Sequence, residues 1–199
     1  MELTNWLLFL ITFSSVLILP GPNAAFVIGQ SLKYGFLTAL TAPLGFMTAT
    51  GIHAVIVFSG LGLIVNKYEV IFNAFKWFGV IYLLFLAYKS FIYTPQKILI
   101  SSKETPILKI YFSALFVSLT NPKALLASLM LYPLFINQEQ SFQKQAILIS
   151  ITAMGVSFLI YSSYCVFASI LKDKLSNSHW ANKLIGGIYV SAAGVLASK

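Results

Sequence analysis

Lys123 is the residue whose position points most directly to chemistry. It lies about 20 Å along a helix axis from Lys109, inside an apolar part of the sequence. A charged amine at that depth in a bilayer is costly unless it faces a cavity or a partner. Lys123 also follows a proline, where free backbone N–H groups at a helix start would favour an anion. The pattern predicts a carboxylate site, and a compatible alternative is that the lysine binds carbonyls released at another helix break.

Two proline-containing breaks interrupt long apolar stretches, and both are candidate sites. Proline removes a backbone N–H and clashes with the preceding turn, so each break should divide a membrane helix. A broken backbone is tolerated in a membrane only where protein or a water-filled cavity satisfies the freed groups. The asparagines beside the breaks are predicted to cap helices, with or without further hydrogen bonds to a substrate. The predicted substrate-binding residues are Pro20, Gly21, Pro22, Asn23, Asn121, Pro122 and Lys123.

His53 is the second titratable group predicted to lie within a span. It is either a buried histidine bonded to a neighbouring helix or a proton carrier, because histidine titrates near neutral pH. The acidic residues lie at segment ends or in loops: Glu2, Glu69, Glu104, Glu139 and Asp173. A buried carboxylate is therefore not available for proton coupling, which leaves His53 or Lys123.

The composition predicts an integral membrane protein. The chain has 199 residues, of which 58% are hydrophobic and only 9% are charged, whereas soluble domains carry about 25% charged residues. The net charge is +8, but the lysines lie mostly between apolar segments, which favours topology signals and lipid headgroups over nucleic acid. The single cysteine, Cys165, excludes an intramolecular disulfide. No cleavable signal peptide is expected at the amino terminus.

Six apolar segments are predicted to cross the membrane as one all-α bundle, and the first and fourth are longer than a straight span needs. Their approximate ranges are 3–32, 36–65, 70–93, 108–136, 145–171 and 180–197. The whole chain, 1–199, is predicted to be a single transmembrane domain with a cytoplasmic linker at about 94–107. The lysine distribution places loops one, three and five in the cytoplasm and both termini outside.

Three pattern matches suggest that the chain contains an internal repeat, about 1–93 and about 108–199. Pro22 recurs as Pro122 at an offset of 100, and Thr48-Ala49-x-Gly51 recurs as Thr152-Ala153-x-Gly155 at an offset of 104. Lys76-x-x-Gly79-x-x-Tyr82 recurs as Lys183-x-x-Gly186-x-x-Tyr189 at an offset of 107. Three spans per repeat would make the second repeat inverted, with broken helices in spans one and four, as in secondary transporters. The alternative is chance recurrence among membrane helices of similar composition.

The motifs resemble those of the LysE/RhtB family of amino-acid exporters, in order and over nearly the whole chain. They are Pro20-Gly21-Pro22-Asn23, Gly51-x-His53, Gly60-Leu61-Gly62, Lys76-Trp77-x-Gly79-x-x-Tyr82-Leu83 and Leu119-Thr120-Asn121-Pro122-Lys123-Ala124. The resemblance implies a bacterial inner-membrane protein that exports amino acids or related solutes in exchange for protons. Ser157 departs from the acidic residue that several relatives carry in the fifth span. This departure favours a neutral substrate, or one recognised by its carboxylate.

The functional hypothesis is a secondary exporter of a small amino acid, with the carboxylate near Lys123 and protons as the exchanged ion. A passive channel or an exporter of another small solute or ion is the alternative. An intramembrane enzyme would need a nucleophile–base pair or metal ligands at membrane depth. The chain offers only two histidines and no deep carboxylate, so no catalytic residue, cofactor or metal site is predicted. The expected partners are an amino acid, protons and membrane lipid, and self-association into a homo-oligomer is left open.

Overall fold

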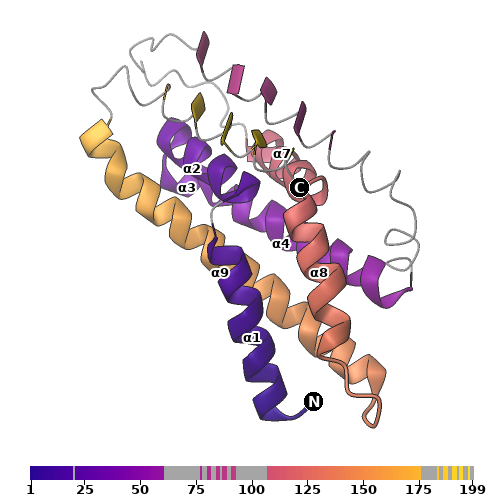
Figure 1. Ribbon diagram of the computed structural model, residues 1–199. Coiled ribbons are helices and arrows are strands. Elements are labelled where there is room, and N and C mark those ends of the chain that lie inside the picture. Colours follow the sequence, from indigo (N-terminus) through magenta and orange to yellow (C-terminus); the bar gives the residue numbers. More distant parts are fainter. Residues whose placement is uncertain are drawn as a thin grey trace.

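The structure is a computed structural model of the 199-residue chain, shown in Figure 1. It describes residues 1–19, 21–60 and 107–175, and separate positions between 77 and 92 and between 183 and 197. In the last continuous range, side chains are described as far as residue 170. Pro20 and the predicted linker as far as residue 106 lie outside the described residues. Most of the predicted third and sixth segments, and with them most of the third repeat motif, also lie outside.

The first predicted segment folds as two helices, α1 (Leu3–Ile18) and α2 (Pro22–Tyr34), whose axes differ by 62°. Pro22 occupies the first turn of α2, where a missing N–H costs little and the fixed φ suits a helix. Gly35 ends α2 with φ 83°, a left-handed conformation that favours glycine. The predicted break in the first segment is confirmed.

The fourth predicted segment is divided in the same way, into α7 (Ile107–Leu119) and α8 (Pro122–Leu134). The two axes differ by 60°. Pro122 again starts the second helix, and Pro133 lies close to its end. The second break is therefore also confirmed, in the segment predicted at 108–136.

The second and fifth segments are the long helical spans of the described chain. A short helix, α3 (Phe36–Ala39), leads into α4 (Thr41–Phe58), and α9 (Phe142–Leu175) is continuous over 34 residues. α4 ends at Phe58 and Gly60 follows with φ 81°, while the predicted end of the second segment at residue 65 lies outside the described residues. The fifth segment is longer than predicted at both ends, since polar residues extend α9 beyond its apolar part.

The described ranges form an all-helical bundle that is consistent with a multi-pass membrane protein. Phe36–Phe58 and Phe142–Ile170 are each long and apolar enough to cross a bilayer, and each bent pair adds one span if it crosses as a unit, for up to four. Figure 1 shows the amino terminus at the same end of the bundle as the connection between α8 and α9. The corner between α2 and α3 and the last turns of α9 lie at the opposite end.

Small residues let α4 approach its neighbours closely. A Cβ atom on Gly45 would lie 2.6 Å from the Tyr111 carbonyl oxygen of α7, so only glycine fits there without a shift. Ala114 of α7 and Ala153 of α9 are likewise fully buried. Close backbone approach of this kind is how membrane helices gain packing energy without a hydrophobic driving force.

Two hydrogen bonds join the two halves of the chain in matching ways. The Trp6 indole of α1 donates to the Thr152 hydroxyl of α9 (2.9 Å), and the Tyr111 hydroxyl of α7 donates to the Thr48 hydroxyl of α4 (2.9 Å). Thr152 follows Thr48 by 104 positions, and Tyr111 follows Trp6 by 105. Each bond therefore links the broken helix of one half to the unbroken span of the other.

An aromatic cluster fixes the helices at the end that holds the amino terminus. Tyr132 of α8 is fully buried, with the rings of Phe9, Phe13 and Phe58 at centroid distances of 5.9, 5.7 and 5.8 Å. Aromatic contacts at these distances add to the area that the rings bury. The cluster therefore packs α1, α4 and α8 against one another.

Candidate functional site

The second break is built around the cap of α8. Asn121 is extended and precedes the helix, and its side-chain oxygen accepts a hydrogen bond from the Lys123 backbone N–H (3.1 Å). The Asn121 carbonyl accepts from the Leu125 N–H, which starts the helical ladder. The predicted capping role of Asn121 is confirmed. One of the N–H groups that was predicted to be free for a carboxylate is thus already bonded.

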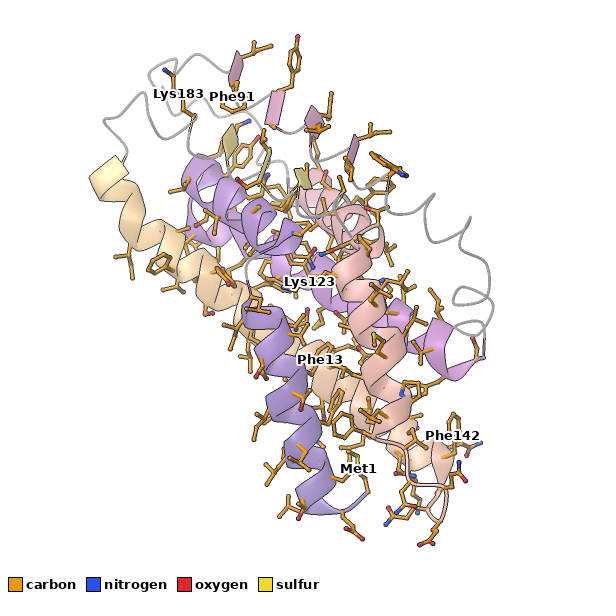
Figure 2. The ribbon with its side chains drawn as sticks, viewed as in Figure 1. Met1, Phe13, Phe91, Lys123, Phe142 and Lys183 are labelled. Atoms are coloured by element: carbon orange, nitrogen blue, oxygen red, sulfur yellow. The ribbon has the colours of Figure 1, made fainter. Side chains whose placement is uncertain are left out.

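Lys123 reaches across from the second break to the first. Its ammonium group donates a hydrogen bond to the Leu19 carbonyl, one residue past the end of α1. Its side chain passes Gly21, where an added Cβ atom would lie 3.5 Å from Lys123 Cδ and 3.7 Å from Nζ. Figure 2 shows Lys123 near the middle of the bundle, well away from Met1 and Phe142 at one end. The predicted contact between this lysine and carbonyls of the opposite break is confirmed.

Two buried asparagines join the breaks directly. The Asn121 amide nitrogen donates to the Asn23 side-chain oxygen (2.9 Å), and the Asn23 amide nitrogen donates to the Ser118 hydroxyl (3.0 Å). Asn23 does not cap α2, because Gly21 is the residue before that helix and α2 has no side-chain cap. The capping role predicted for Asn23 was therefore wrong. Its amide instead belongs to a polar network that also approaches the Tyr161 hydroxyl of α9.

The sequence reasoning missed a tyrosine at the first break. The Tyr164 hydroxyl of α9 donates to the Ile18 carbonyl, the last residue of α1. Ile18 and Leu19 are both exposed, at 58% and 60%, and their carbonyls accept hydrogen bonds from side chains of α9 and α8. Tyr161 and Tyr164 are three residues apart and lie on one helix face. That spacing was the available signal, although it also fits ordinary packing.

His53 of α4 lies beside the second break and is buried against the neighbouring helices. Its exposed fraction is 1%, and its ring approaches the Leu119 backbone at the end of α7. Within the described part of the chain, Nε2 has no hydrogen-bond partner. The Ser157 hydroxyl of α9, which follows His53 by 104 positions, is also buried without a partner among those residues. His53 Nε2 in α4 and the Ser157 hydroxyl in α9 thus both lack a hydrogen-bond partner within the described residues.

The electrostatic character of the site follows from the four helix ends that meet there. α1 and α7 end at the breaks, and α2 and α8 begin there. Each helix start carries roughly half a positive charge and each helix end roughly half a negative one. The sequence places no acidic residue in α1, α2, α4, α7 or α8. The site therefore offers N–H groups and an ammonium to an anion, and carbonyl oxygens to a cation.

Comparison with known proteins assigns the chain to a family. The family model described as LysE type translocator matches residues 14–199. The chain belongs to the LysE type translocator family. This confirms the resemblance drawn from the sequence motifs.

Curated members of similar length have related descriptions. A homoserine/homoserine lactone efflux protein of Salmonella typhi is 26% identical over 197 residues, 97% of this chain and 96% of the relative. A leucine efflux protein of Klebsiella pneumoniae is 26% identical, with 98% of this chain and 95% of the relative covered. An uncharacterized membrane protein of Vibrio cholerae is 26% identical over 100% of this chain and 98% of its own length. No solved structure matches the chain significantly.

Proposed function

We propose that this LysE-family protein is a secondary exporter of a small amino acid across the bacterial cytoplasmic membrane, in exchange for protons. The observation that carries the proposal is the meeting of the two breaks, with Lys123 of one bonded to the Leu19 carbonyl of the other. In transporters built from broken helices, freed backbone groups at the break bind the substrate. The break residues, with a partly buried lysine, supply such groups here.

The relatives support an amino-acid substrate. Their names give homoserine, homoserine lactone and leucine as exported compounds. These compounds share an amino group on the carbon atom next to a carbonyl carbon, and none has a charged side chain. A site with one ammonium side chain and no acidic residue in the helices that form the breaks suits such solutes. We therefore propose a neutral amino acid, or a close derivative, as the substrate.

The proposed substrate site keeps the residues of both breaks, with distinct roles. Lys123 contacts the substrate carboxylate together with N–H groups in the first turns of α2 and α8, other than the Lys123 N–H that Asn121 already binds. Asn23 and Asn121 hold the breaks at a fixed separation through their shared hydrogen bond (2.9 Å). Gly21 leaves room for the lysine side chain, and Pro22 and Pro122 start the two helices. Pro20 completes the proposed set from its place in the sequence.

The proposed architecture is six spans in two inverted repeats, within one domain that covers the chain. The matching bonds of Trp6 to Thr152 and Tyr111 to Thr48 support the repeat. The lysine distribution supports an orientation with both termini outside. Lys33, after the buried part of α2, and Lys109, at the start of α7, belong to the predicted cytoplasmic side, while Glu2 and Glu139 belong to the other.

His53 is the proposed proton-coupling residue. It is buried beside the second break, with one ring nitrogen unbonded within the described residues. A histidine whose ring nitrogen is free within a transport pathway is able to take up and release a proton during the cycle. Ser157 at the matching position of α9 offers a hydroxyl but no charge, so coupling through a carboxylate at that position is not part of the proposal.

Intracellular amino-acid pools test the proposal and name the substrate together. Bacterial cells that overexpress the protein are compared with cells carrying the empty vector, after both are fed a mixture of dipeptides that raises all pools. We expect one or a few neutral amino acids to fall inside the expressing cells and to rise in the medium. Unchanged pools for all amino acids, with the protein present in the membrane, contradict the proposal. The exported amino acid is then followed in membrane vesicles. If its rate of loss does not depend on the proton gradient, the result indicates a passive channel.

A further inference from the structure

The carbonyl end of α1 is a built acceptor site whose two oxygens are held by groups from other helices. The last carbonyls of a helix have no partner within it. Here the Ile18 carbonyl accepts from the Tyr164 hydroxyl of α9, and the Leu19 carbonyl accepts from the Lys123 ammonium of α8. Neither bond is local in sequence, so both depend on how the helices pack.

The lysine ammonium that donates to the Leu19 carbonyl indicates which other ligands this carbonyl can bind. A lysine side chain ends in a primary ammonium with three donors, which is also the form of the amino group in an amino acid at neutral pH. The negative end of α1 favours any cation at this point. Because the helices that form the breaks hold no acidic residue, backbone carbonyls are the acceptors available for a substrate ammonium there.

We propose that the Ile18 and Leu19 carbonyls form the binding site for the substrate's ammonium group, and that Lys123 leaves Leu19 to pair with the substrate's carboxylate. The proposal rests on the proposed export of amino acids and adds the second half of their recognition. In the empty protein, Lys123 occupies the place of the substrate ammonium. When an amino acid binds, its ammonium replaces Lys123 at Leu19, and its carboxylate takes the lysine as a partner.

The surroundings of Lys123 permit this exchange. Its side chain is only partly buried, and the space beside it is open enough that a Gly21 Cβ atom would still lie 3.7 Å from Nζ. The ammonium and carboxylate of an amino acid are attached to the same carbon atom, so Nζ needs to move only by about one hydrogen-bond length, ~3 Å. The exchange keeps the net charge of the site constant, because a zwitterionic amino acid brings one positive and one negative charge.

Competition between analogues tests the ammonium site. Purified protein in liposomes carries out counterflow of labelled leucine, or of labelled homoserine if it carries only that. The competitors are isocaproate or γ-hydroxybutyrate, which are the same molecules without the amino group. We expect the acid to compete at least about tenfold more weakly than the amino acid, because it leaves the carbonyls unpaired or occupied by Lys123. Equal competition overturns the inference alone, whereas the absence of counterflow for every neutral amino acid contradicts the proposed function as well.

Removing Lys123 gives the sharper test, because it should weaken the binding of one ligand and strengthen the binding of another. Lys123→Met should weaken leucine binding but improve binding of isoamylamine, which is leucine without its carboxylate. The amine then no longer competes with the protein's own ammonium, so its half-saturating concentration should fall roughly fivefold or more. Thermal stabilisation of the purified protein by isoamylamine measures this concentration. Lys109 is an exposed lysine at the start of α7. Lys109→Met is therefore the matched control and should leave the half-saturating concentration of isoamylamine unchanged.

Tyr164→Phe supplies the same test if Lys123→Met does not give folded protein. The variant removes one hydroxyl and frees the Ile18 carbonyl. We expect isoamylamine to bind more tightly than to the wild type, by a smaller factor than in Lys123→Met. Unchanged or weaker amine binding in whichever of the two variants folds overturns the inference.

Discussion

Both helix breaks are built around a proline, but their chemical characters are opposite. At the second break, Asn121 caps α8 with its side chain and Lys123 supplies a charge. At the first break, Gly21 leaves α2 without a side-chain cap, and the Leu19 carbonyl accepts a bond from the other break. The first break therefore provides acceptors and space, while the second provides donors and charge.

Under the proposed inverted repeat, this difference would make the site between the two breaks asymmetric. Pro22 and Pro122 start equivalent helices 100 positions apart, so both halves break the helix in the same way. At that offset Asn23 corresponds to Lys123, and Gly21 corresponds to Asn121. In the proposed repeat, the residues that differ around the shared proline would give each half a separate role. The following predictions test that division of roles.

Gly21 should tolerate a small side chain and not a large one. An alanine Cβ fits at ordinary contact distance from Lys123 (3.5 Å to Cδ), whereas a leucine would displace the lysine from the Leu19 carbonyl. A leucine there would also fill the space that Lys123 needs to meet the substrate carboxylate, so we expect export by Gly21→Leu to fall about tenfold or more. Efflux from preloaded cells, corrected for the amount of protein in the membrane, measures both variants. Equal export by Gly21→Leu and Gly21→Ala would show that Lys123 does not need the space beside Gly21 for transport.

Asn121→Ala should destabilise the protein more than Asn23→Ala. The first variant loses both the cap of α8 and the bond to Asn23, for about 2–3 kcal/mol, and the second loses only bonds of its amide, for about 1–2 kcal/mol. Thermal unfolding in detergent gives the order of the two effects. The double variant should be less destabilised than the sum by about 0.5–1.5 kcal/mol, because the residues share one bond. Strict additivity would argue against the bridge between the breaks.

His53→Gln should change the pH dependence of export more than substrate affinity. Glutamine keeps a polar side chain of similar length beside Leu119 but cannot carry a proton at neutral pH. We expect a flatter pH profile of export in vesicles, with half-saturation by the amino acid changed by less than about threefold. A profile with the wild-type shape would exclude His53 as the proton-coupling group.

The smallest expected effects concern the matching bonds between the halves. Thr48→Val and Thr152→Val each remove one acceptor, from Tyr111 and Trp6 respectively. Hydrogen bonds between membrane helices average about 0.6 kcal/mol, so both variants should unfold at slightly lower temperature and by a similar amount. A large effect in one and none in the other would weaken the proposed equivalence of the two halves.

The sequence was sufficient to predict the breaks and the long-range contact of Lys123, because both follow from proline chemistry and the cost of a buried charge. The misassigned cap at Asn23 has a simple reason. The residue before the proline is the cap, so Asn121 before Pro122 caps its helix, while Asn23 comes after Pro22 and lies inside α2. The position of asparagine relative to proline carried this information.

Other features depend on packing, which sequence periodicity does not reveal. Tyr164 reaches Ile18 only because α9 crosses α1 and α2 at that level. Ser118 joins the polar network because α7 places it opposite Asn23. The end of α4 at Phe58 follows from the conformation of Gly60 and not from a loss of apolar residues, since the sequence continues as Leu61-Gly62-Leu63-Ile64-Val65.

Efflux by Lys123→Ala tests the central claim, that transport passes through the point where the two breaks meet. Cells carrying wild-type protein, Lys123→Ala or the control Lys109→Ala are preloaded with the exported amino acid, and its loss is followed over time with the protein in the membrane quantified. The account predicts that Lys123→Ala behaves like cells without the protein, while Lys109→Ala exports at the wild-type rate. Wild-type efflux by Lys123→Ala would contradict it.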